Sequence, residues 1–221
     1  MARRYQRGAL RISTVGEERG HGDIAYQAVA VSPADIEHAV VNILRLHEAP
    51  TAMLFCATRD NVRRLHASLI ERGFAAVALS GEHSQNERNA ALQALRDGRA
   101  RVCVATDVAA RGLDLPSLSL VVHVDLPRDA EALQHRSGRT GRAGNKGTAI
   151  LIVPCLGFGP GGVRLGYGGG FFERTLAALD PRPVTVGVSY THGFLPMLRS
   201  GPTDWPLDAM LTEDGVMFEQ T

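Results

Sequence analysis

Short apolar runs alternate with amphipathic helical patterns through the first 153 of the 221 residues, and this alternation limits the possible folds more than any other feature. The runs are 24–31, 52–57, 75–79, 102–105, 118–124 and 148–153. Most are apolar throughout, which is typical of strands buried on both faces of a parallel sheet. Helices between successive strands would cover those faces. We therefore predict a three-layer α/β fold around a mainly parallel sheet.

Helix starts are marked between these strands. Ser32 and Pro33 form a cap followed by a proline in the first turn. Ser84 and Glu87 have the spacing of a capping box. Asp129 is placed to cap a helix that runs toward the second arginine-rich segment.

The chain changes character after residue 153. Eight glycines lie within 157–170, a helical pattern follows from Phe171, and extended segments are predicted at 184–188, 208–212 and 215–219. We divide the chain into a loose leading segment (1–23), an α/β domain (24–153) and a C-terminal fragment (154–221). The fragment could add βα elements to the same sheet.

Composition excludes several classes of protein. Three cysteines (Cys56, Cys103 and Cys155) are too few and too scattered for a disulfide framework or a zinc site, so we predict no metal. No apolar run has the length of a membrane span, and we expect a cytoplasmic protein that makes no contact with a membrane. Lys146, the single lysine, precedes Gly147, so a phosphate-binding Walker A loop is absent. Residues 1–153 carry 20 Lys and Arg against 16 Asp and Glu, a mild excess compatible with nucleic acid.

Two segments rich in glycine and arginine, 105–114 and 135–144, carry the strongest functional signal. His135, Arg136, Arg139 and Arg142 recur every three residues and would share one face of a helix. Guanidinium groups that crowd one face favour an anion between them, and a triphosphate suits their planar donors. The alternative is a solvated basic helix end, which the glycines at 138, 141 and 144 disfavour.

These two segments resemble motifs V and VI of the second RecA-like domain of DEAD-box RNA helicases. Residues 54–59 resemble motif IV, and Gln85 with Arg88 resembles the family's Gln-x-x-Arg element. The resemblance covers about 20–153. Ser137 departs from it, because the family usually has an apolar residue there.

The resemblance implies a role for each matching residue. Arg139 and Arg142 would act as catalytic arginine fingers on the γ-phosphate of ATP. Nucleotide contacts would come from Gly112, Asp114, His135 and Arg136. RNA backbone contacts would come from Thr58, Arg59, Arg88, Thr106 and Arg111. Without the resemblance, Arg59 and Arg88 could be ordinary solvated helix charges, and Thr106 could simply end a strand.

The family's ATPase needs two domains, and the first is missing from this sequence. We therefore expect RNA and ATP as partners, with ATP bound weakly and shared with the missing domain. Mg²⁺ would enter only with ATP. Efficient ATP hydrolysis or unwinding by this chain alone is not expected, and its oligomeric state is open.

The C-terminal fragment resembles the closing part of 5-formyltetrahydrofolate cyclo-ligase, on residues 153–158, 164–174 and 206–213. The resemblance implies a phosphate-binding loop made by Arg164, Gly166, Gly168, Gly169, Gly170 and Glu173. The family usually has Tyr-Asp where this chain has Phe172-Glu173, and its N-terminal portion is missing, so we expect no cyclo-ligase activity.

Residues 150–154 could belong to either parent family, so the two resemblances meet there. A chimera of two α/β fragments is our hypothesis, whether engineered or arisen by recombination. The rivals are a helicase domain with a disordered tail, a cyclo-ligase-type ATP and folate enzyme fragment, and a fused chain without selected activity.

Overall fold

The computed structural model describes residues 23–111, 113, 118–127, 129–141, 144–179, 182–202 and 204–219. The predicted leading segment 1–23 lies outside this part of the chain, apart from Asp23.

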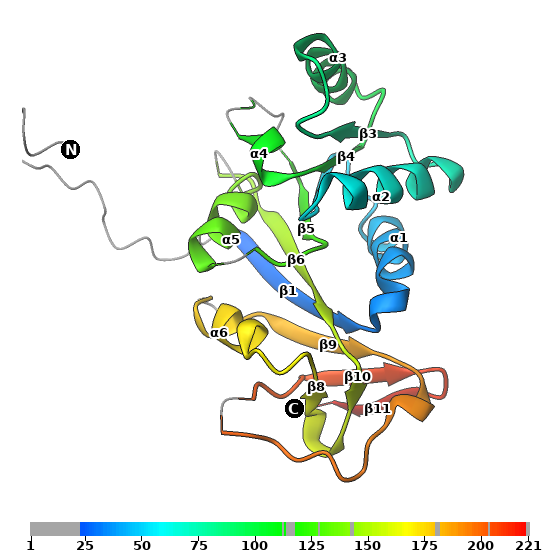
Figure 1. The fold of residues 1–221 in the computed structure, drawn as a ribbon, viewed down its shortest axis with the longest axis vertical. Helices are drawn as coiled ribbons and strands as arrows, with labels where there is room; N and C mark the ends of the chain where they lie inside the picture. The colour runs from blue at the N-terminus through cyan, green and yellow to red at the C-terminus, as the bar shows by residue number, and fades with distance from the viewer. Residues whose placement is uncertain are drawn as a thin grey trace, which may run out of the picture.

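A nine-stranded sheet forms the centre of the described structure, in the order β11-β10-β9-β1-β6-β5-β2-β4-β3 (Figure 1). The strands are β1 Ile24–Val31, β2 Ala52–Phe55, β3 Ala76–Leu79, β4 Val102–Ala105, β5 Leu120–His123, β6 Gly147–Pro154, β9 Val184–Val188, β10 Ala209–Thr212 and β11 Gly215–Glu219. Neighbouring strands pair in parallel, except that β10 and β11 form an antiparallel hairpin. The predicted α/β class with a mainly parallel sheet is confirmed.

Helices cover the sheet on two sides (Figure 1). They are α1 Ile36–His47, α2 Arg59–Glu71, α3 Gln85–Arg96, α4 Asp107–Ala110, α5 Ala130–Ser137 and α6 Phe171–Ala177. The buried residues of α1 and α2 share one apolar cluster with Val31 of β1. Leu133 of α5 and Leu176 of α6 share another with Ala30, the preceding residue of β1. Adjacent strand residues thus face opposite layers, as a three-layer fold requires.

The predicted helix caps are present. The backbone N–H of Ser84 donates to the Glu87 carboxylate at 2.7 Å, and the Glu87 N–H donates to the Ser84 hydroxyl at 3.3 Å. Asp129 accepts a 2.7 Å hydrogen bond from the N–H of Ala132 and so begins α5. These local contacts fix where α3 and α5 start, and therefore where the adjoining loops lie.

The C-terminal fragment continues the same sheet. β1 lies between β6 and β9, and residues 27–31 pair in parallel register with Val184–Val188. Phe158, Leu207 and Met210 are fully buried and belong to the cluster that includes Ala30 of β1. The described part of residues 154–219 is therefore folded onto the sheet, in contrast to the alternative of a helicase domain with a disordered tail.

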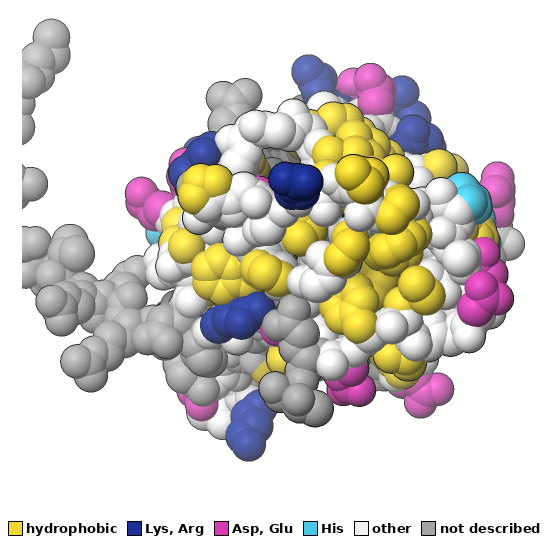
Figure 2. Space-filling model, turned by 90° about the horizontal axis from the view of Figure 1, so that it is seen from below, with side chains coloured by type: hydrophobic (Ala, Val, Ile, Leu, Met, Phe, Trp, Pro, Cys, Tyr) yellow, Lys and Arg dark blue, Asp and Glu magenta, His cyan; other side chains and the backbone are white. Residues whose placement is uncertain are grey.

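One face of this fragment lacks a helical cover within the described residues. Val184, Val188 and Val216 are 59%, 42% and 64% exposed. Apolar side chains gather on the lower end of the molecule, where β9–β11 lie (Figure 2). A largely apolar groove of about 810 Å³ lies between α1 and β9.

Candidate nucleic-acid and nucleotide interface

The candidate site lies along the edge of the sheet where the parallel strands β2, β4 and β5 end. Thr58 follows β2 and begins α2, because its hydroxyl accepts from the N–H of Asn61 at 3.1 Å. Thr106 follows β4 and begins α4 in the same way, through the N–H of Ala109. Loops at the carboxyl ends of parallel strands are where α/β proteins commonly bind ligands.

Motif V is joined to motif VI by an ion pair between α4 and α5. The Arg136 guanidinium donates to both oxygens of Asp107, at 2.6 and 2.7 Å, and to the carbonyl oxygen of Asp125 at 2.6 Å. It also lies 5.2 Å from the centre of the Phe55 ring. Arg136 is therefore buried and held inside the protein, whereas the neighbouring His135 is exposed.

The expected helical face from His135 to Arg142 is wrong beyond Ser137. α5 ends at Ser137, and Gly138 follows as its C-terminal cap. Arg139 lies past the helix and donates a 3.2 Å hydrogen bond to the carbonyl oxygen of Leu113. Glycine is unfavourable inside a helix, so Gly138 disfavours a further turn of α5. The expected positions Gly112, Asp114 and Arg142 lie outside the described residues.

Arg88 also contacts α4, at Ala109, whereas Arg136 contacts it at Asp107. The Nη2 of Arg88 donates to the carbonyl oxygen of Ala109 at 2.9 Å, and its buried Nε has no hydrogen-bond partner within the described part of the chain. Arg111 follows α4 directly and is exposed. The short helix α4 is thus fixed between Arg88 and Arg136, and Arg111 is presented at its end.

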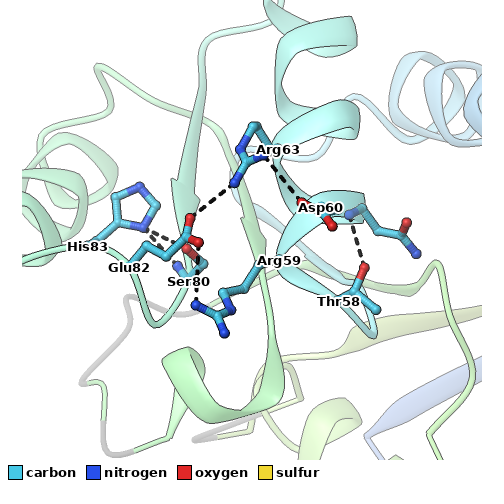
Figure 3. A network of polar contacts seen from close by, with 8 residues as sticks. Thr58, Arg59, Asp60, Arg63, Ser80, Glu82 and His83 are labelled. Atoms are coloured by element: carbon cyan, nitrogen blue, oxygen red, sulfur yellow. Dashed lines mark hydrogen bonds and ion pairs between the residues drawn. The ribbon is translucent and has the colours of Figure 1, made fainter.

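Arg59 belongs to a network of exposed charges at the start of α2 (Figure 3). It donates to Glu82 at 3.3 Å, and Arg63 donates to the other oxygen of Glu82 at 3.2 Å. Neither Arg63 nor Glu82 is among the site residues predicted from the sequence. Arg63 could have been found from its position four residues after Arg59, whereas Glu82 comes close only through the fold.

A buried polar contact explains how Ser137 is accommodated. Its hydroxyl lies 3.0 Å from Nε2 of His123 on β5, and both residues are fully buried. Burial, with a smaller effect of the Arg136 charge, lowers the pKa of His123 to about 3, so the imidazole is neutral. The buried Ser137 hydroxyl therefore has His123 as a hydrogen-bond partner, which explains how a polar residue is tolerated at this position.

The glycine-rich segment serves packing at several positions. A Cβ on Gly162 would lie 2.6 Å from the carbonyl oxygen of Leu207, whereas Gly168 and Gly169 face open space. Arg164 is 8% exposed, pairs with Glu173 at 2.6 Å and lies 4.8 Å from the centre of the Phe172 ring. Arg164 and Glu173 thus neutralise each other, and a phosphate contact at this loop stays a prediction.

The described residues contain neither a metal-binding cluster nor a helix that could span a membrane. No group of three or more His, Cys, Asp or Glu side chains in them is arranged to hold a metal ion. None of the helices they form is long and apolar enough to cross a membrane.

Comparison with known proteins identifies two families. Residues 35–144 match the helicase conserved C-terminal domain, and residues 112–213 match the 5-formyltetrahydrofolate cyclo-ligase family. The two matches overlap, so the second begins well before the predicted junction at 150–154.

Individual relatives come from the DEAD-box helicases. ATP-dependent RNA helicase SrmB of Escherichia coli (strain K12) is 45% identical over 122 residues, which are 54% of this chain and 28% of SrmB. The chain spans less than a third of the length of the curated relatives it matches.

Solved structures that resemble this chain are also DEAD-box proteins. A chain in the crystal structure of E. coli DEAD-box protein SrmB bound to regulator of ribonuclease activity A aligns with a TM-score of 0.63 and 31% identity, covering 80% of this chain and 97% of that one. S. cerevisiae Dbp5 bound to RNA and ADP BeF3 aligns with a TM-score of 0.55 and 33% identity, covering 60% of this chain and 36% of that one. The chain therefore belongs to the DEAD-box RNA helicases through its conserved C-terminal domain, and residues 112–213 also match the model of the 5-formyltetrahydrofolate cyclo-ligase family.

Proposed function

We propose that this chain is the half of an ATP-dependent DEAD-box RNA helicase that binds the RNA backbone and contacts the ATP phosphates. The observation that carries the proposal is the position of α4 between Arg88 and Arg136, which presents Arg111 to solvent at the edge of the sheet. Dbp5, a structural relative, is solved with RNA and a nucleotide, which supports the same ligands here.

The RNA-contacting surface would consist of Thr58, Arg59, Arg88, Thr106 and Arg111. Guanidinium groups and helix starts bind phosphate oxygens without distinguishing bases, so binding would be salt-dependent and tolerant of sequence. The hydroxyls of Thr58 and Thr106 already cap helices, so their part would be to position the backbone N–H groups beside them.

The nucleotide would lie between this chain and a separate ATPase domain. Arg139 and Arg142 would neutralise charge that develops on the γ-phosphate, and Gly112, Asp114 and His135 would line the nucleotide. Arg136 is buried against Asp107, so its contribution would be to position the arginines that follow it. Mg²⁺ would come with ATP, and the cytoplasm is the compartment that we infer for such a protein.

The test is RNA binding across a salt series, measured by fluorescence anisotropy with a single-stranded oligonucleotide. Arg111→Ala should weaken binding and reduce the slope of log K against log salt by about 0.7, the value for one lost phosphate contact on a single strand. Arg45→Ala removes an exposed arginine from the last turn of α1 and should change neither. The absence of salt-dependent binding by the unaltered chain would refute the proposal.

Catalysis by the isolated chain is a separate question. We expect no RNA-stimulated ATP hydrolysis by these 221 residues on their own, because they contain no Walker A loop to hold the nucleotide. An RNA-stimulated activity of the purified chain that disappears in Arg139→Ala would contradict this expectation.

A second candidate rests on the match of residues 112–213 to the cyclo-ligase family. It is a fragment of an ATP- and folate-dependent enzyme, in which Gly166, Gly168, Gly169 and Gly170 would approach a phosphate. Formation of the methenyl product from 5-formyltetrahydrofolate and ATP, followed by absorbance, would establish this function. If neither RNA binding nor folate turnover is found, the third hypothesis remains, a chimeric chain without selected activity.

A further inference from the structure

Two arginines at the start of α2 hold one carboxylate between them. Arg59 and Arg63 lie one helical turn apart, so their side chains emerge on the same face. Glu82, from the loop between β3 and α3, places one oxygen 3.3 Å from Arg59 and the other 3.2 Å from Arg63 (Figure 3). One carboxylate therefore bridges two cations that would otherwise repel each other, and Asp60 places a second carboxylate 3.3 Å from Arg63.

This bridge is easily displaced. The side chains of Arg59, Arg63 and Glu82 are 60%, 68% and 51% exposed. Exposed ion pairs are weak, because water and salt screen them and holding long side chains in place costs entropy. A phosphodiester offers two charged oxygens to the same pair of guanidinium groups, which bind phosphate well.

The bridge stands at the rim of a groove that can hold more than a phosphate. The groove has a volume of about 650 Å³ and lies against the edge strand β3. Its apolar lining is small: Val62, Ala76, Val77, Ala78, Ala90 and Ala91. Small apolar side chains leave space beside the arginines for a ribose or a base.

His83 adds a donor to the same lining. Its Nδ1 accepts a 3.0 Å hydrogen bond from the backbone N–H of Ser80, which leaves Nε2 as the donor of the ring. The rim thus offers two guanidinium groups and one imidazole N–H. The acidic groups beside them are Glu82, Asp60, which pairs with Arg63, and Glu87 in the groove lining.

We propose that Arg59 and Arg63 form an additional phosphodiester subsite, which Glu82 occupies in the free protein and vacates when RNA binds. The inference rests on the proposed RNA function and extends it, since Arg63 and Glu82 are outside the residues assigned to RNA above. The subsite adjoins Thr58, so it would lengthen the RNA-contacting surface along α2. Glu82 would set the affinity by competing with the phosphate.

Matched variants test the subsite. Glu82→Gln removes the competing charge and keeps the side-chain length, so RNA binding at low salt should tighten about two- to fivefold, the range expected for exposed charge pairs. Arg63→Ala should weaken binding and reduce the salt slope by about 0.7. In the double variant, the gain from Glu82→Gln should shrink toward zero, because the Arg63 side of the site is gone.

The pair Arg64 and Glu37 provides the control. Arg64 follows Arg63 on α2 and pairs with Glu37 of α1 at 2.9 Å, outside the residues that line the groove. Glu37→Gln and Arg64→Ala change the net charge by the same amounts and should leave affinity and slope within error of the unaltered chain. A shift equal to that of the groove variants would show that net charge alone matters, and would overturn the subsite.

The outcomes separate this inference from the proposed function. If Arg111→Ala weakens binding but Glu82→Gln does not tighten it, the subsite is wrong and the RNA function stands. If Glu82→Gln tightens binding and Arg111→Ala has no effect, the subsite stands and the motif V surface is wrong. If the unaltered chain binds no RNA, or if Glu82→Gln instead tightens binding of a polyglutamate peptide, the RNA subsite is overturned.

Discussion

The carboxylate of Asp107 accepts two hydrogen bonds from the guanidinium of Arg136, at 2.6 and 2.7 Å. The Arg136 side chain is 5% exposed and that of Asp107 is 39% exposed. The pair links α4 to α5, and thereby fixes the loop that carries Arg111 relative to the segment that carries Arg139. A site divided between two loops needs such a link to keep its geometry.

Asp107→Asn should destabilise the fold, because it leaves the buried Arg136 charge without its counter-charge. Loss of one partner of a fully buried pair costs about 3–5 kcal/mol, and the partial exposure of Asp107 lowers our expectation to about 2 kcal/mol. Urea unfolding followed by circular dichroism measures this. Asp97→Asn, in the exposed pair with Arg99, should stay within about 0.5 kcal/mol. A similarly small change in Asp107→Asn would show that the ion pair does not hold the loops.

His123 should make the stability fall in acid. Its pKa is lowered to about 3 in the folded protein, mainly by burial, and is about 6.5 in an unfolded chain. The unfolded chain therefore binds a proton between these values and the folded protein does not. This contribution to stability is complete above pH 6.5 and is lost as the pH falls toward 3, by up to about 1.4 kcal/mol per pH unit.

His123→Gln isolates that contribution, because the glutamine amide reaches about as far as Nε2, can therefore still hydrogen-bond to Ser137, and does not titrate. Urea unfolding of both proteins between pH 4 and 7 should show a slope smaller by up to one proton in the variant. Identical slopes would mean that His123 takes up a proton in the folded state, in conflict with its burial.

Features that depend on residues close together in the chain were predicted correctly, whereas contacts between distant residues were not. Strand 184–188 and the caps at Ser84 and Asp129 depend on neighbouring residues, and they were predicted correctly. The partners of Arg136 and Arg59 lie 29 and 23 positions away in the chain. No local pattern encodes such pairs, because the register of the sheet and the layer of each helix bring them together.

The prediction that His135, Arg136, Arg139 and Arg142 share one helical face was wrong for a related reason. A three-residue repeat predicts a shared helical face only while the helix lasts, and α5 ends at Ser137 before Arg139 is reached. The burial of Arg164 was likewise not predictable from local sequence. Arg164 lies in the hairpin of β7 (Gly157–Phe158) and β8 (Arg164–Leu165), and its side chain is buried by Phe172 and Glu173 of α6. The roles assigned to the candidate site residues remain predictions.

Glu173→Gln should destabilise the C-terminal fragment. The Arg164–Glu173 pair is almost fully buried, with side chains 8% and 12% exposed, so the lost charge leaves Arg164 uncompensated. We expect a loss of about 3 kcal/mol in urea unfolding. Glu219→Gln, at the exposed end of β11, should have little effect. If Glu173→Gln were as stable as the unaltered chain, Arg164 would be free to serve a ligand, which would favour the phosphate-loop hypothesis.

Gly187→Val tests whether the two fragments form one cooperative unit. A Cβ at this position of β9 would lie 2.3 Å from the sulfur of Met210 and 2.7 Å from a methyl carbon of Leu207, and both side chains are fully buried. Overpacking of this kind costs about 1–3 kcal/mol. Gly169→Val is the control, because nothing lies within 4 Å of the added Cβ there.

Amide hydrogen exchange should report the result strand by strand. β1 is paired with both β6 and β9 and shares a cluster with Met210, so protection in β1 and β9 should be similar in the unaltered chain and should fall together in Gly187→Val. That result would mean that residues 24–153 and 154–221 unfold as one body. Faster exchange confined to residues beyond 183, with β1 and β6 still protected, would mean that the helicase domain is stable alone and carries the cyclo-ligase segment as a separable addition.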